Sequence, residues 1–390
     1  MDERLMEKIL LITNIPTPYR LPLFTRLSQR CSETGRSLKV VFCEHGYARR
    51  KFEMKEDAFG FEHTYLDGGT LSDAKDVEKT YFLYRGLLKL FRREKPSKII
   101  LAGFSPATAK AYLWNLLTGT PFYIWSGTIN KGNRNTSFHR RFFRRMMIRR
   151  AAGFIAYGSE ARNYLTGLGA ETGRVWVATN AVDTDFFSTR TEELRRRKDE
   201  KEQTLFNFIY IGYLVPRKKV EKVIEAAALL SESRKDFRLT IVGDGSSRAE
   251  LEKVCSASAL SERVRFEGYR QKEELPAYLA EADAFLFQTG YDIWGLVLNE
   301  AMAAGLPVIA SVNAGATTDL IIDGETGFTA DYDRIEETAE LMNKLIENRE
   351  LCRTIGSRAR EFVKEKASLE KAAEAFVLAL NTSTPTAEKK

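Results

Sequence analysis

Short apolar runs alternate with amphipathic segments through the first half of the chain. The runs are rich in Ile, Leu, Val and Phe, and they lie at 8–14 (KILLITN), 38–44 (LKVVFCE), 98–104 (KIILAGF), 121–127 (PFYIWSG) and 153–159 (GFIAYGS). Between them, apolar residues recur at helical spacing, as in LPLFTRLSQRC after the first run. Short buried strands that alternate with helices predict a parallel sheet covered by helices on both faces.

The same alternation restarts after a charged, breaker-like segment at 189–203 (TRTEELRRRKDEKEQ). Strands are predicted at 206–214, at 238–246 and in three later runs, VRFEGYR, AFLFQTG and LPVIASV, and an amphipathic helix is predicted over 220–230. We therefore predict an α/β protein with two Rossmann-like, doubly wound domains that face a central cleft. In open parallel sheets of this kind, ligands bind at the carboxyl ends of the strands.

The two halves of the pattern also predict the domain boundaries. We expect an N-terminal domain over 1–185 and a C-terminal domain over 186–365. The remaining residues, 366–390, are expected to form a helix that crosses back to the N-terminal domain, followed by a disordered tail.

The charged residues are unevenly distributed between the two halves. The chain has 60 Lys and Arg against 53 Asp and Glu, which gives a formal net charge of +7. Residues 1–180 hold 30 basic and 16 acidic residues, whereas residues 181–390 hold 30 basic and 37 acidic residues. This change of sign at mid-chain indicates two domains with different partners, and the basic half favours an anionic surface or ligand.

The cysteines and histidines provide no recognisable metal cluster. The four cysteines, Cys31, Cys43, Cys255 and Cys352, have no CxxC spacing, and the chain has three histidines in all. We therefore expect reduced thiols in a cytosolic protein and no zinc site. The start of the chain has no long apolar region, so no secretory signal is expected. No apolar stretch reaches about eighteen residues, so no membrane-spanning helix is expected either.

The stretch 291–311 (YDIWGLVLNEAMAAGLPVIAS) places two carboxylates around the start of a predicted helix. Asp292 precedes the helix, Glu300 lies inside it, and Gly305 and Pro307 end it. The first amides of a helix have no acceptor within it and bind phosphate readily. One acid on each side of a phosphate site matches a ligand of the form sugar–diphosphate–ribose–base.

Two other interpretations of the acid pair remain open on spacing alone. Glycosidases also use two acids, about 5–10 Å apart, although they need no helix start between them. Alternatively, Asp292 lies near the helix dipole and Glu300 on the solvent face of the helix, with no ligand at all.

Two further features at strand ends favour a phosphate-containing ligand. The segment PRKK at 216–219 follows a predicted strand, and its Lys218 can reach a diphosphate as a point charge. The segment VGDGS at 242–246 ends another strand with two glycines, which allow the backbone to approach a ligand closely. Each of these features is common alone. Together with the acid pair of 291–311 they make three features at strand ends, which rarely occur in this order by chance.

Nearly the whole chain resembles the retaining glycosyltransferases of family 4, which have the GT-B fold. The most specific part is the stretch 291–311, which is similar to that family's motif of two glutamates separated by seven residues. The other segments that carry the resemblance are NIPTPYRLPLF (14–24), AYGSEARNYLTGLG (156–169), VWVATNAVDTDFF (175–187), IGYLVPRKKVEKVIEA (211–226), VGDGSSRAELE (242–252), VRFEGYRQKEELPAYLAEADAFLFQT (264–289) and DLIIDGETGF (319–328).

The resemblance implies that the C-terminal domain binds a nucleotide-sugar donor. Glu300 is expected to bind the donor ribose. Asp292, the first acidic residue of the motif, is expected to meet the donor sugar beside the reacting carbon and to be the catalytic residue. Lys218 matches the lysine that binds the diphosphate, and the base is expected near Phe266. The other implied donor-binding residues are Gly212, Arg217, Gly243, Gly268, Tyr269, Gly295, Leu296 and Val297.

The N-terminal domain is implied to lie on the acceptor side. The loop 16–20 matches the family's first loop, which faces the donor across the cleft. The acceptor-side residues are expected to be Pro18, Tyr19, Arg20, Ser126 and Gly127.

The sequence departs from the family's pattern at several positions. Tyr213 stands where many members have arginine, which leaves the diphosphate clamp incomplete and makes Arg217 or Lys219 a candidate substitute. Lys219 itself stands where a glycine usually follows the lysine. The first acid of the motif is Asp292, one methylene shorter than glutamate, and the loop 16–20 lacks the paired glycines of many members.

The predicted reaction is transfer of a sugar from a nucleoside diphosphate to an acceptor hydroxyl, with retention at the anomeric carbon. We expect no metal and no other cofactor. The segment DTD at 183–185 resembles an Asp-x-Asp metal motif, but it lies away from the donor site, where Asp more often shapes a turn. The alternatives are an epimerase or phosphorylase of the same fold and, in a different class, a basic nucleic-acid-binding protein. No nucleic-acid motif is present, so no such partner is expected.

The segment HRRFFRRMMIRR at 139–150 predicts a basic amphipathic helix. Phe and Met residues occupy one half of its helical wheel, and the other half holds Arg140, Arg141, Arg144, Arg145 and Arg149. Such a helix suits an anionic lipid surface, although its apolar face can instead pack on the sheet. We expect a saccharide or lipid-linked acceptor, and a cytoplasmic protein held peripherally at the inner face of the plasma membrane. The segment 47–55 is a second candidate for lipid contact.

Overall fold

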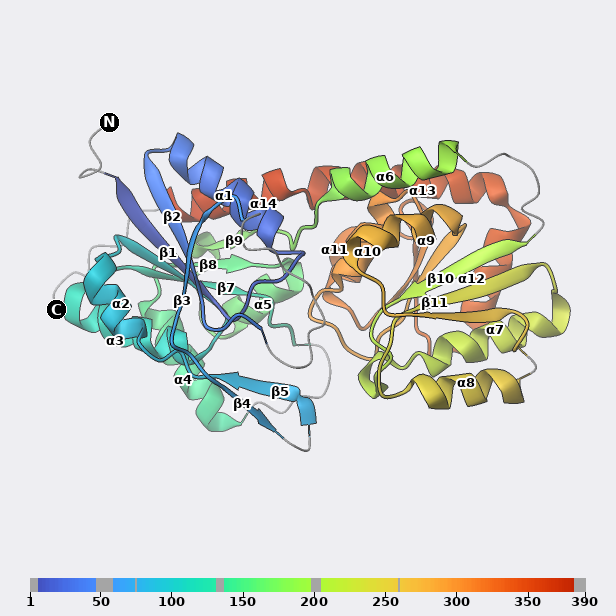
Figure 1. Cartoon of the computed structure of the whole chain (residues 1–390), viewed down its shortest axis with the longest axis horizontal. Coiled ribbons are helices and arrows are strands. Elements are labelled where there is room, and N and C mark those ends of the chain that lie inside the picture. The colour runs from blue at the N-terminus through green and yellow to red at the C-terminus, as the bar shows by residue number, and fades with distance from the viewer. Residues whose placement is uncertain are drawn as a thin grey trace. The chain divides into compact units, whose positions relative to one another are not determined.

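The computed structural model describes residues 6–46, 59–73, 76–130, 137–197, 205–258 and 260–381 (Figure 1). These residues form two compact units. Unit 1 contains the described residues up to 180 together with 369–381, and unit 2 contains 181–368. The predicted disordered tail and the segment 47–55 lie outside the described residues.

Unit 1 is built on a seven-stranded parallel sheet with the strand order β3-β2-β1-β6-β7-β8-β9. An antiparallel hairpin of β4 and β5 forms a separate two-stranded sheet. The strands are β1 (Glu7–Thr13), β2 (Arg36–Phe42), β3 (Glu62–Tyr65), β4 (Thr70–Asp73), β5 (Asp76–Phe82), β6 (Lys98–Ala102), β7 (Phe122–Ser126), β8 (Gly153–Ala156) and β9 (Val175–Val177).

The helices of unit 1 connect these strands, and the last one comes from the end of the described chain. They are α1 (Leu21–Glu33), α2 (Leu87–Glu94), α3 (Pro106–Thr118), α4 (Phe138–Arg150), α5 (Ser159–Gly167) and α14 (Leu369–Asn381), with a 3₁₀ turn at Thr172–Arg174. Helix α2 contacts α3, and α3 contacts α4, whereas α14 contacts α1 (Figure 1). Helix α1 connects β1 to β2, and α3 connects β6 to β7, which lies towards the other edge of the sheet. Because both connections are expected to be right-handed, the two helices lie on opposite faces of the sheet.

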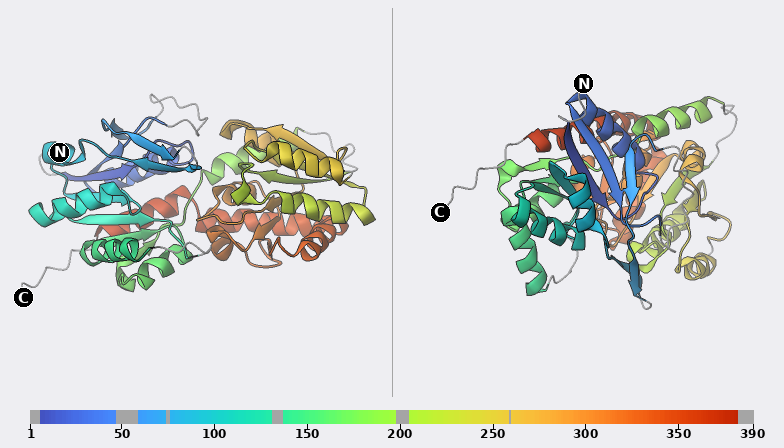
Figure 2. Two further views of the ribbon diagram at one scale, coloured as in Figure 1. Left: turned by 90° about the horizontal axis from the view of Figure 1, so that it is seen from below. Right: turned by 60° about the vertical axis from the view of Figure 1, so that its left-hand side comes forward.

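Helix α14 is held on unit 1 by charged and aromatic contacts. Arg26 and Arg30 of α1 both bind the carboxylate of Glu370. The ring of Phe376 packs edge-on against Trp125 of β7, with 5.2 Å between the ring centroids. The last helix of the described chain is therefore part of the N-terminal unit (Figure 2, red ribbon).

Unit 2 is built on a six-stranded parallel sheet with the order β12-β11-β10-β13-β14-β15. Its strands are β10 (Phe206–Ile211), β11 (Phe237–Val242), β12 (Val264–Gly268), β13 (Ala284–Phe287), β14 (Val308–Ser311) and β15 (Phe328–Ala330). Its helices are α6 (Thr184–Arg196), α7 (Glu221–Ser233), α8 (Arg248–Ala257), α9 (Leu275–Glu281), α10 (Leu296–Ala303), α11 (Gly315–Leu320), α12 (Ile335–Glu347) and α13 (Arg349–Lys366), with 3₁₀ turns at Pro216–Lys218 and Lys272–Glu274.

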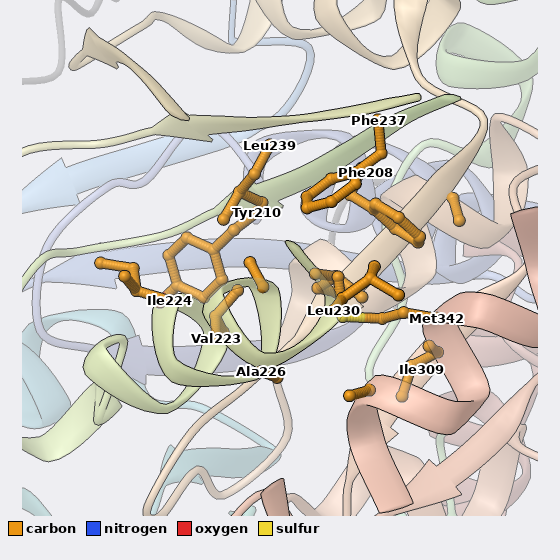
Figure 3. Packing of buried hydrophobic residues seen from close by; sticks show 14 of the residues in the cluster. Phe208, Tyr210, Val223, Ile224, Ala226, Leu230, Phe237, Leu239, Ile309 and Met342 are labelled. Carbon is orange, nitrogen blue, oxygen red and sulfur yellow. The ribbon is translucent and has the colours of Figure 1, made fainter. Parts of the chain in front are cut away.

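The core of unit 2 shows why its strands read as nearly continuous apolar runs. Phe208 and Tyr210 of β10 pack between Leu239 of β11 and the apolar face of α7, which presents Ile224 and Leu230 (Figure 3). Both faces of the sheet are covered by helices, so residues that point either way are removed from water.

The structure confirms the α/β architecture and every strand predicted from a long apolar run. It corrects the predicted breaker at 189–203, which is helical at its start. The division between the compact units falls at 180/181, and just after it Asp183 accepts a hydrogen bond from the Phe186 amide at 3.0 Å and caps α6. Helix α6 then continues to Arg196 through most of the charged segment.

No helix among the described residues is both long and apolar enough to cross a membrane. Helices α3 and α4 of unit 1, which are central to the surface considered below, are each 13 residues long.

Candidate functional site

The strand order of unit 2 reverses direction between β10 and β13. From β10 the chain proceeds to β11 and β12 on one side, and then returns to β13, β14 and β15 on the other. The loops that leave these two central neighbours diverge, which leaves space for a ligand at the carboxyl edge. The PRKK segment follows β10, and the Asp292 loop follows β13.

An ion pair joins these two loops. Lys218 Nζ donates to Asp292 Oδ2 at 2.6 Å, although the two residues are 74 positions apart in sequence. Lys218 is only 8% exposed. A largely buried charge needs a partner, so each residue fixes the position of the other.

The environment of Asp292 keeps its carboxylate ionised. Burial acts to raise the pKa of Asp292, but the charge and hydrogen bond of Lys218, the charge of Arg217 and the Trp294 amide outweigh burial, so the pKa is lowered. The Asp292 backbone is fixed as well. Its amide donates to the Asn313 carbonyl, and its carbonyl accepts from the Gly315 amide, both at 3.1 Å.

Helix α10 begins immediately after this loop, and Gly295 is required at its start. The residue has a φ of +101°, and a Cβ atom there would lie 2.1 Å from the Phe287 ring. Only glycine meets both conditions without displacement. The amides of Leu296 and Val297 follow in the first turn, where helical amides have no acceptor within the helix and attract anions.

Glu300 lies about one and a half turns into α10 and has a different environment from Asp292. It is half-buried, and burial raises its pKa to about 8, with the charge of Lys272 as the opposing influence. The carboxyl group is therefore mostly protonated at neutral pH. At pH 7, Asp292 is therefore negatively charged, whereas Glu300 is mostly neutral.

The other predicted donor-binding residues line the same edge. Gly212 follows β10 and Gly243 follows β11, where a Cβ on Gly243 would lie 1.8 Å from the Gly212 carbonyl oxygen. Phe266 and Gly268 lie at the end of β12, followed by Tyr269, whose hydroxyl donates to Gln271 at 3.3 Å. The structure thus gathers the sequence-predicted donor residues at the carboxyl edge of one sheet.

The candidate substitutes for the missing arginine are both engaged elsewhere. Arg217 Nη1 donates to the Tyr291 carbonyl at 2.6 Å, so it ties the PRKK loop to the Asp292 loop. Lys219 has a φ of +47° and forms an exposed ion pair with Asp333 at 3.2 Å. This left-handed conformation is one that glycine adopts more readily than lysine.

Three groups near α10 were missed by sequence reasoning. Lys272, whose charge acts on Glu300, lies in an ordinary-looking charged run. The buried Trp294 indole donates to Asn299 at 3.0 Å and anchors the start of α10. Ser311 at the end of β14 donates to the Thr289 carbonyl at 2.9 Å. Of the three, only Ser311 had a usable signal in the sequence, because it is a polar residue at the end of a predicted strand.

Unit 1 has its own cluster at a carboxyl edge. The guanidinium of Arg20 lies between two rings, with its Cζ 4.3 Å from the Trp125 centroid and 4.9 Å from that of Tyr157. Ser126, at the end of β7, donates to Thr128 at 3.2 Å. A Cβ on Gly127 would lie 2.3 Å from the Tyr157 ring, so glycine is needed there.

The remaining predicted acceptor-side residues and the DTD segment also have clear positions. Pro18 and Tyr19 lie with Arg20 in the turn between β1 and α1. Asp183 caps α6, and Asp185 forms an ion pair with Lys364 at 3.0 Å. Within the ranges that the structure describes, no group of three His, Cys, Asp or Glu residues is placed to hold a metal ion.

Comparison with known proteins shows a family match within the C-terminal unit. Residues 191–362 match the family described as Glycosyl transferases group 1. The chain is 27% identical over 280 residues to alpha-D-kanosaminyltransferase of Streptomyces kanamyceticus, which covers 68% of this chain and 72% of that enzyme. It is 31% identical over 192 residues to GDP-mannose-dependent alpha-(1-6)-phosphatidylinositol monomannoside mannosyltransferase of Mycobacterium tuberculosis, covering 47% and 49%. Matches to several other relatives span 38–54% of their lengths.

Solved structures establish the fold over the whole length. HepE of Anabaena, in complex with UDP and glucose, aligns with a TM-score of 0.73 at 18% identity, covering 97% of this chain and 100% of that one. The sucrose-phosphate synthase of Thermosynechococcus elongatus also aligns with a TM-score of 0.73, at 16% identity, covering 96% and 98%. The fold is therefore GT-B, and residues 191–362 are similar to the Glycosyl transferases group 1 model.

The ion pair predicts strong energetic coupling between its two residues. Lys218→Met and Asp292→Asn should each lower the free energy of unfolding by about 3 kcal/mol, because each leaves a largely buried charge without its partner. The double variant should lose clearly less than the sum of the two. Urea denaturation of the four proteins measures the coupling, and additive losses would contradict a direct pair.

The raised pKa of Glu300 predicts a pH-dependent cost to stability. The native pKa is about 8 against an ordinary value of 4.5, so the native state binds more protons than the unfolded chain between these values. Stability therefore falls as pH rises through this window, and Glu300→Gln should remove that fall. The difference in Tm between the variant and the unmodified protein should be small at pH 5 and grow towards pH 8.

Exposed Glu325 provides the matched control for this measurement. Glu325→Gln should follow the unmodified protein at every pH. A Tm difference for Glu300→Gln that stays constant from pH 5 to pH 8 would contradict the assignment.

Proposed function

We propose that this chain, whose residues 191–362 belong to the Glycosyl transferases group 1 family, transfers a hexose from a nucleoside-diphosphate sugar to an acceptor hydroxyl with retention. One observation carries the proposal. At the strand-order reversal of unit 2, a buried lysine, an ionised aspartate and a neutral glutamate surround the start of one helix.

The leaving diphosphate is stabilised by groups that are already in place. Departure of the sugar develops negative charge on the diphosphate, and Lys218 supplies a positive charge next to it. The amides of Leu296 and Val297 add hydrogen-bond donors at the positive end of a helix dipole. Preorganised donors of this kind contribute most where charge develops, because they need no reorientation during the reaction.

Asp292 stabilises and orients the sugar as positive character builds on its anomeric carbon. The bond from this carbon to the diphosphate oxygen breaks, and a bond to the acceptor oxygen forms on the same face. The proton of the acceptor hydroxyl passes to the departing diphosphate oxygen, so no protein nucleophile is needed. The lowered pKa of Asp292 supports this role, because only the ionised form provides the negative charge.

Glu300 binds the ribose as a neutral acid. Its pKa of about 8 leaves one hydroxyl donor and one carbonyl acceptor at pH 7, which together match the two hydroxyls of a ribose. A neutral acid also avoids placing a second negative charge near the diphosphate.

The acceptor is proposed to be a saccharide, free or lipid-linked, held by the carboxyl edge of unit 1. Arg20, whose guanidinium lies over the rings of Trp125 and Tyr157, presents a cation with several N–H donors there, which suits the hydroxyls of a sugar. The name of the mycobacterial relative includes phosphatidylinositol monomannoside, which supports a lipid-linked acceptor.

The family match and the transferase relatives favour transfer over the two alternative functions. An epimerase or phosphorylase of the same fold would give a different product from the same donor. A nucleic-acid-binding protein would gain thermal stability from an oligonucleotide instead of from a nucleoside diphosphate.

A donor panel tests the proposal directly. Thermal unfolding with UDP and with GDP should show a rise in Tm with one of them and none with an oligonucleotide. Donor hydrolysis is then measured across sugars on that nucleotide, and NMR of the product with a simple sugar acceptor reports the anomeric configuration. Inversion would overturn retention, and stabilisation by the oligonucleotide alone would overturn the transferase assignment.

Glu300→Ala should weaken binding of the stabilising nucleoside diphosphate about tenfold, because hydrogen bonds to the ribose are lost. Glu300→Gln should keep most of the affinity at pH 7, since an amide also offers one donor face and one acceptor. Calorimetric titration measures both variants, with Glu325→Ala as an exposed control. Unchanged affinity in Glu300→Ala would remove Glu300 from the ribose site.

Activity should persist in excess EDTA. The positive groups proposed for the diphosphate are Lys218 and the start of α10, so no added cation is needed to neutralise the departing diphosphate. The transfer rate with and without chelator measures this. A rate abolished by EDTA and restored by manganese would contradict metal independence.

A further inference from the structure

We propose that the exposed surface of α3 and α4 in unit 1 inserts into an anionic lipid bilayer. We define the α3–α4 surface by six apolar residues and four arginines: Leu113, Leu116 and Leu117 of α3, and Phe138, Phe142, Phe143, Arg140, Arg141, Arg145 and Arg149 of α4. The inference rests on the exposure and charge of these residues and is independent of the donor and reaction proposed above.

The apolar members of the α3–α4 surface are unusually exposed. Leu117 and Phe138 are each 80% exposed, and the other four range from 49% to 58%. A single exposed apolar residue is ordinary, but six on two contacting helices are a concentration of the kind found at interaction sites. On α3, these leucines lie opposite the buried Ala107, Ala111 and Asn115 and so face away from the sheet.

Helix α4 is anchored at its C-terminal end, and its first turns are exposed. Met147 and Ile148 are its buried residues, and Arg150 Nε donates to Asn115 Oδ1 of α3 at 2.6 Å. The expectation that the Phe/Met face packs on the sheet is therefore correct only for Met147. Phe138 and Phe142 are four residues apart and share one exposed side of the helix.

The arginines of α4 divide into structural and exposed groups. Arg144, expected among the lipid-facing residues, is half-buried: it donates to the Tyr164 hydroxyl and lies 5.2 Å from the Phe104 ring centroid. Arg140 and Arg141 are exposed. Arg145 and Arg149 line a hollow of about 380 Å³ together with residues 166–169, where two guanidinium groups can meet a headgroup phosphate.

Charge complementarity selects an anionic bilayer as the partner. From Leu87 to Arg150 the sequence holds fourteen Lys and Arg and a single acid, Glu94. That acid is already bound by Lys8 at 2.8 Å and by Lys39 at 3.2 Å. Apolar residues flanked by arginines match the boundary between acyl chains and anionic headgroups, where aromatic and leucine side chains insert and cations remain near phosphates.

Flotation with lipid vesicles tests the proposal on the full chain. The unmodified protein should float with phosphatidylcholine vesicles that contain about one third phosphatidylglycerol, and much less with pure phosphatidylcholine. Higher salt should weaken binding, because exposed charges are screened over about 10 Å at 0.1 M. No flotation with the anionic vesicles at low salt would overturn the inference.

Two pairs of variants separate the electrostatic and apolar contributions. Arg140→Gln with Arg141→Gln should reduce partitioning about 20-fold or more, at about fivefold for each cation. Phe138→Gln with Phe142→Gln should reduce it about tenfold or more, and Leu117→Gln should reduce it in the same direction. Equal binding by these variants and the unmodified protein would overturn the inference.

Matched controls remove two exposed arginines, or two exposed apolar side chains, outside the α3–α4 surface. Arg353→Gln with Arg358→Gln changes two exposed arginines of α13, and Ile322→Gln with Leu378→Gln changes two exposed apolar residues. These controls should bind vesicles normally. A similar loss in the controls, or oligonucleotide binding that depends on Arg140 and Arg141 without vesicle binding, would overturn the inference. Unchanged Tm and donor hydrolysis in the α4 variants would support it, because a folding defect would change both.

Discussion

The ion pair between Lys218 and Asp292 is the contact on which the proposed donor site depends. It joins the loops that follow β10 and β13, which are neighbours in the sheet although their sequences are far apart. The site therefore exists only when the parallel sheet has formed in the correct strand order. Arg217, through the Tyr291 carbonyl, adds a second link between the same two loops. Both links bring the positive charge of the loop after β10 to the start of α10, the helix that follows the Asp292 loop.

The acid pair shows how environment divides two similar groups into different roles. Asp292 has a lysine partner and a backbone amide, and its pKa is lowered despite burial. For Glu300, the charge of Lys272 opposes burial without outweighing it, and the pKa rises to about 8. One residue thus supplies charge and the other supplies hydrogen bonds without charge. The seven residues between them allow this separation, because they place one acid in a loop and the other inside a helix.

The sequence predicted the strands well, and with them the polar and glycine residues that lie at strand ends, because both depend on local pattern. Long apolar runs formed the central strands, whereas β3, the β4–β5 hairpin and β15 are short or lie at edges, where periodicity is weak. Contacts between segments that are far apart in the sequence could not be predicted from local pattern. A helical wheel grouped Arg144 with the exposed arginines, but its position depends on Tyr164 and Phe104 from other elements. Lys272 was missed for the same reason, since only the fold brings its charge near Glu300.

The return of α14 to unit 1 has a consequence for synthesis of the protein. Leu23, Phe24 and Leu27 of α1 are buried in the finished unit, and α14, which contacts α1, comes from residues 369–381. The ribosome makes unit 2 between these segments, which takes roughly 10–40 s at about 5–20 residues per second. The N-terminal unit must wait for that interval without its final helix. During translation, the nascent chain therefore presents apolar surface to chaperones and to neighbouring chains that the completed protein conceals.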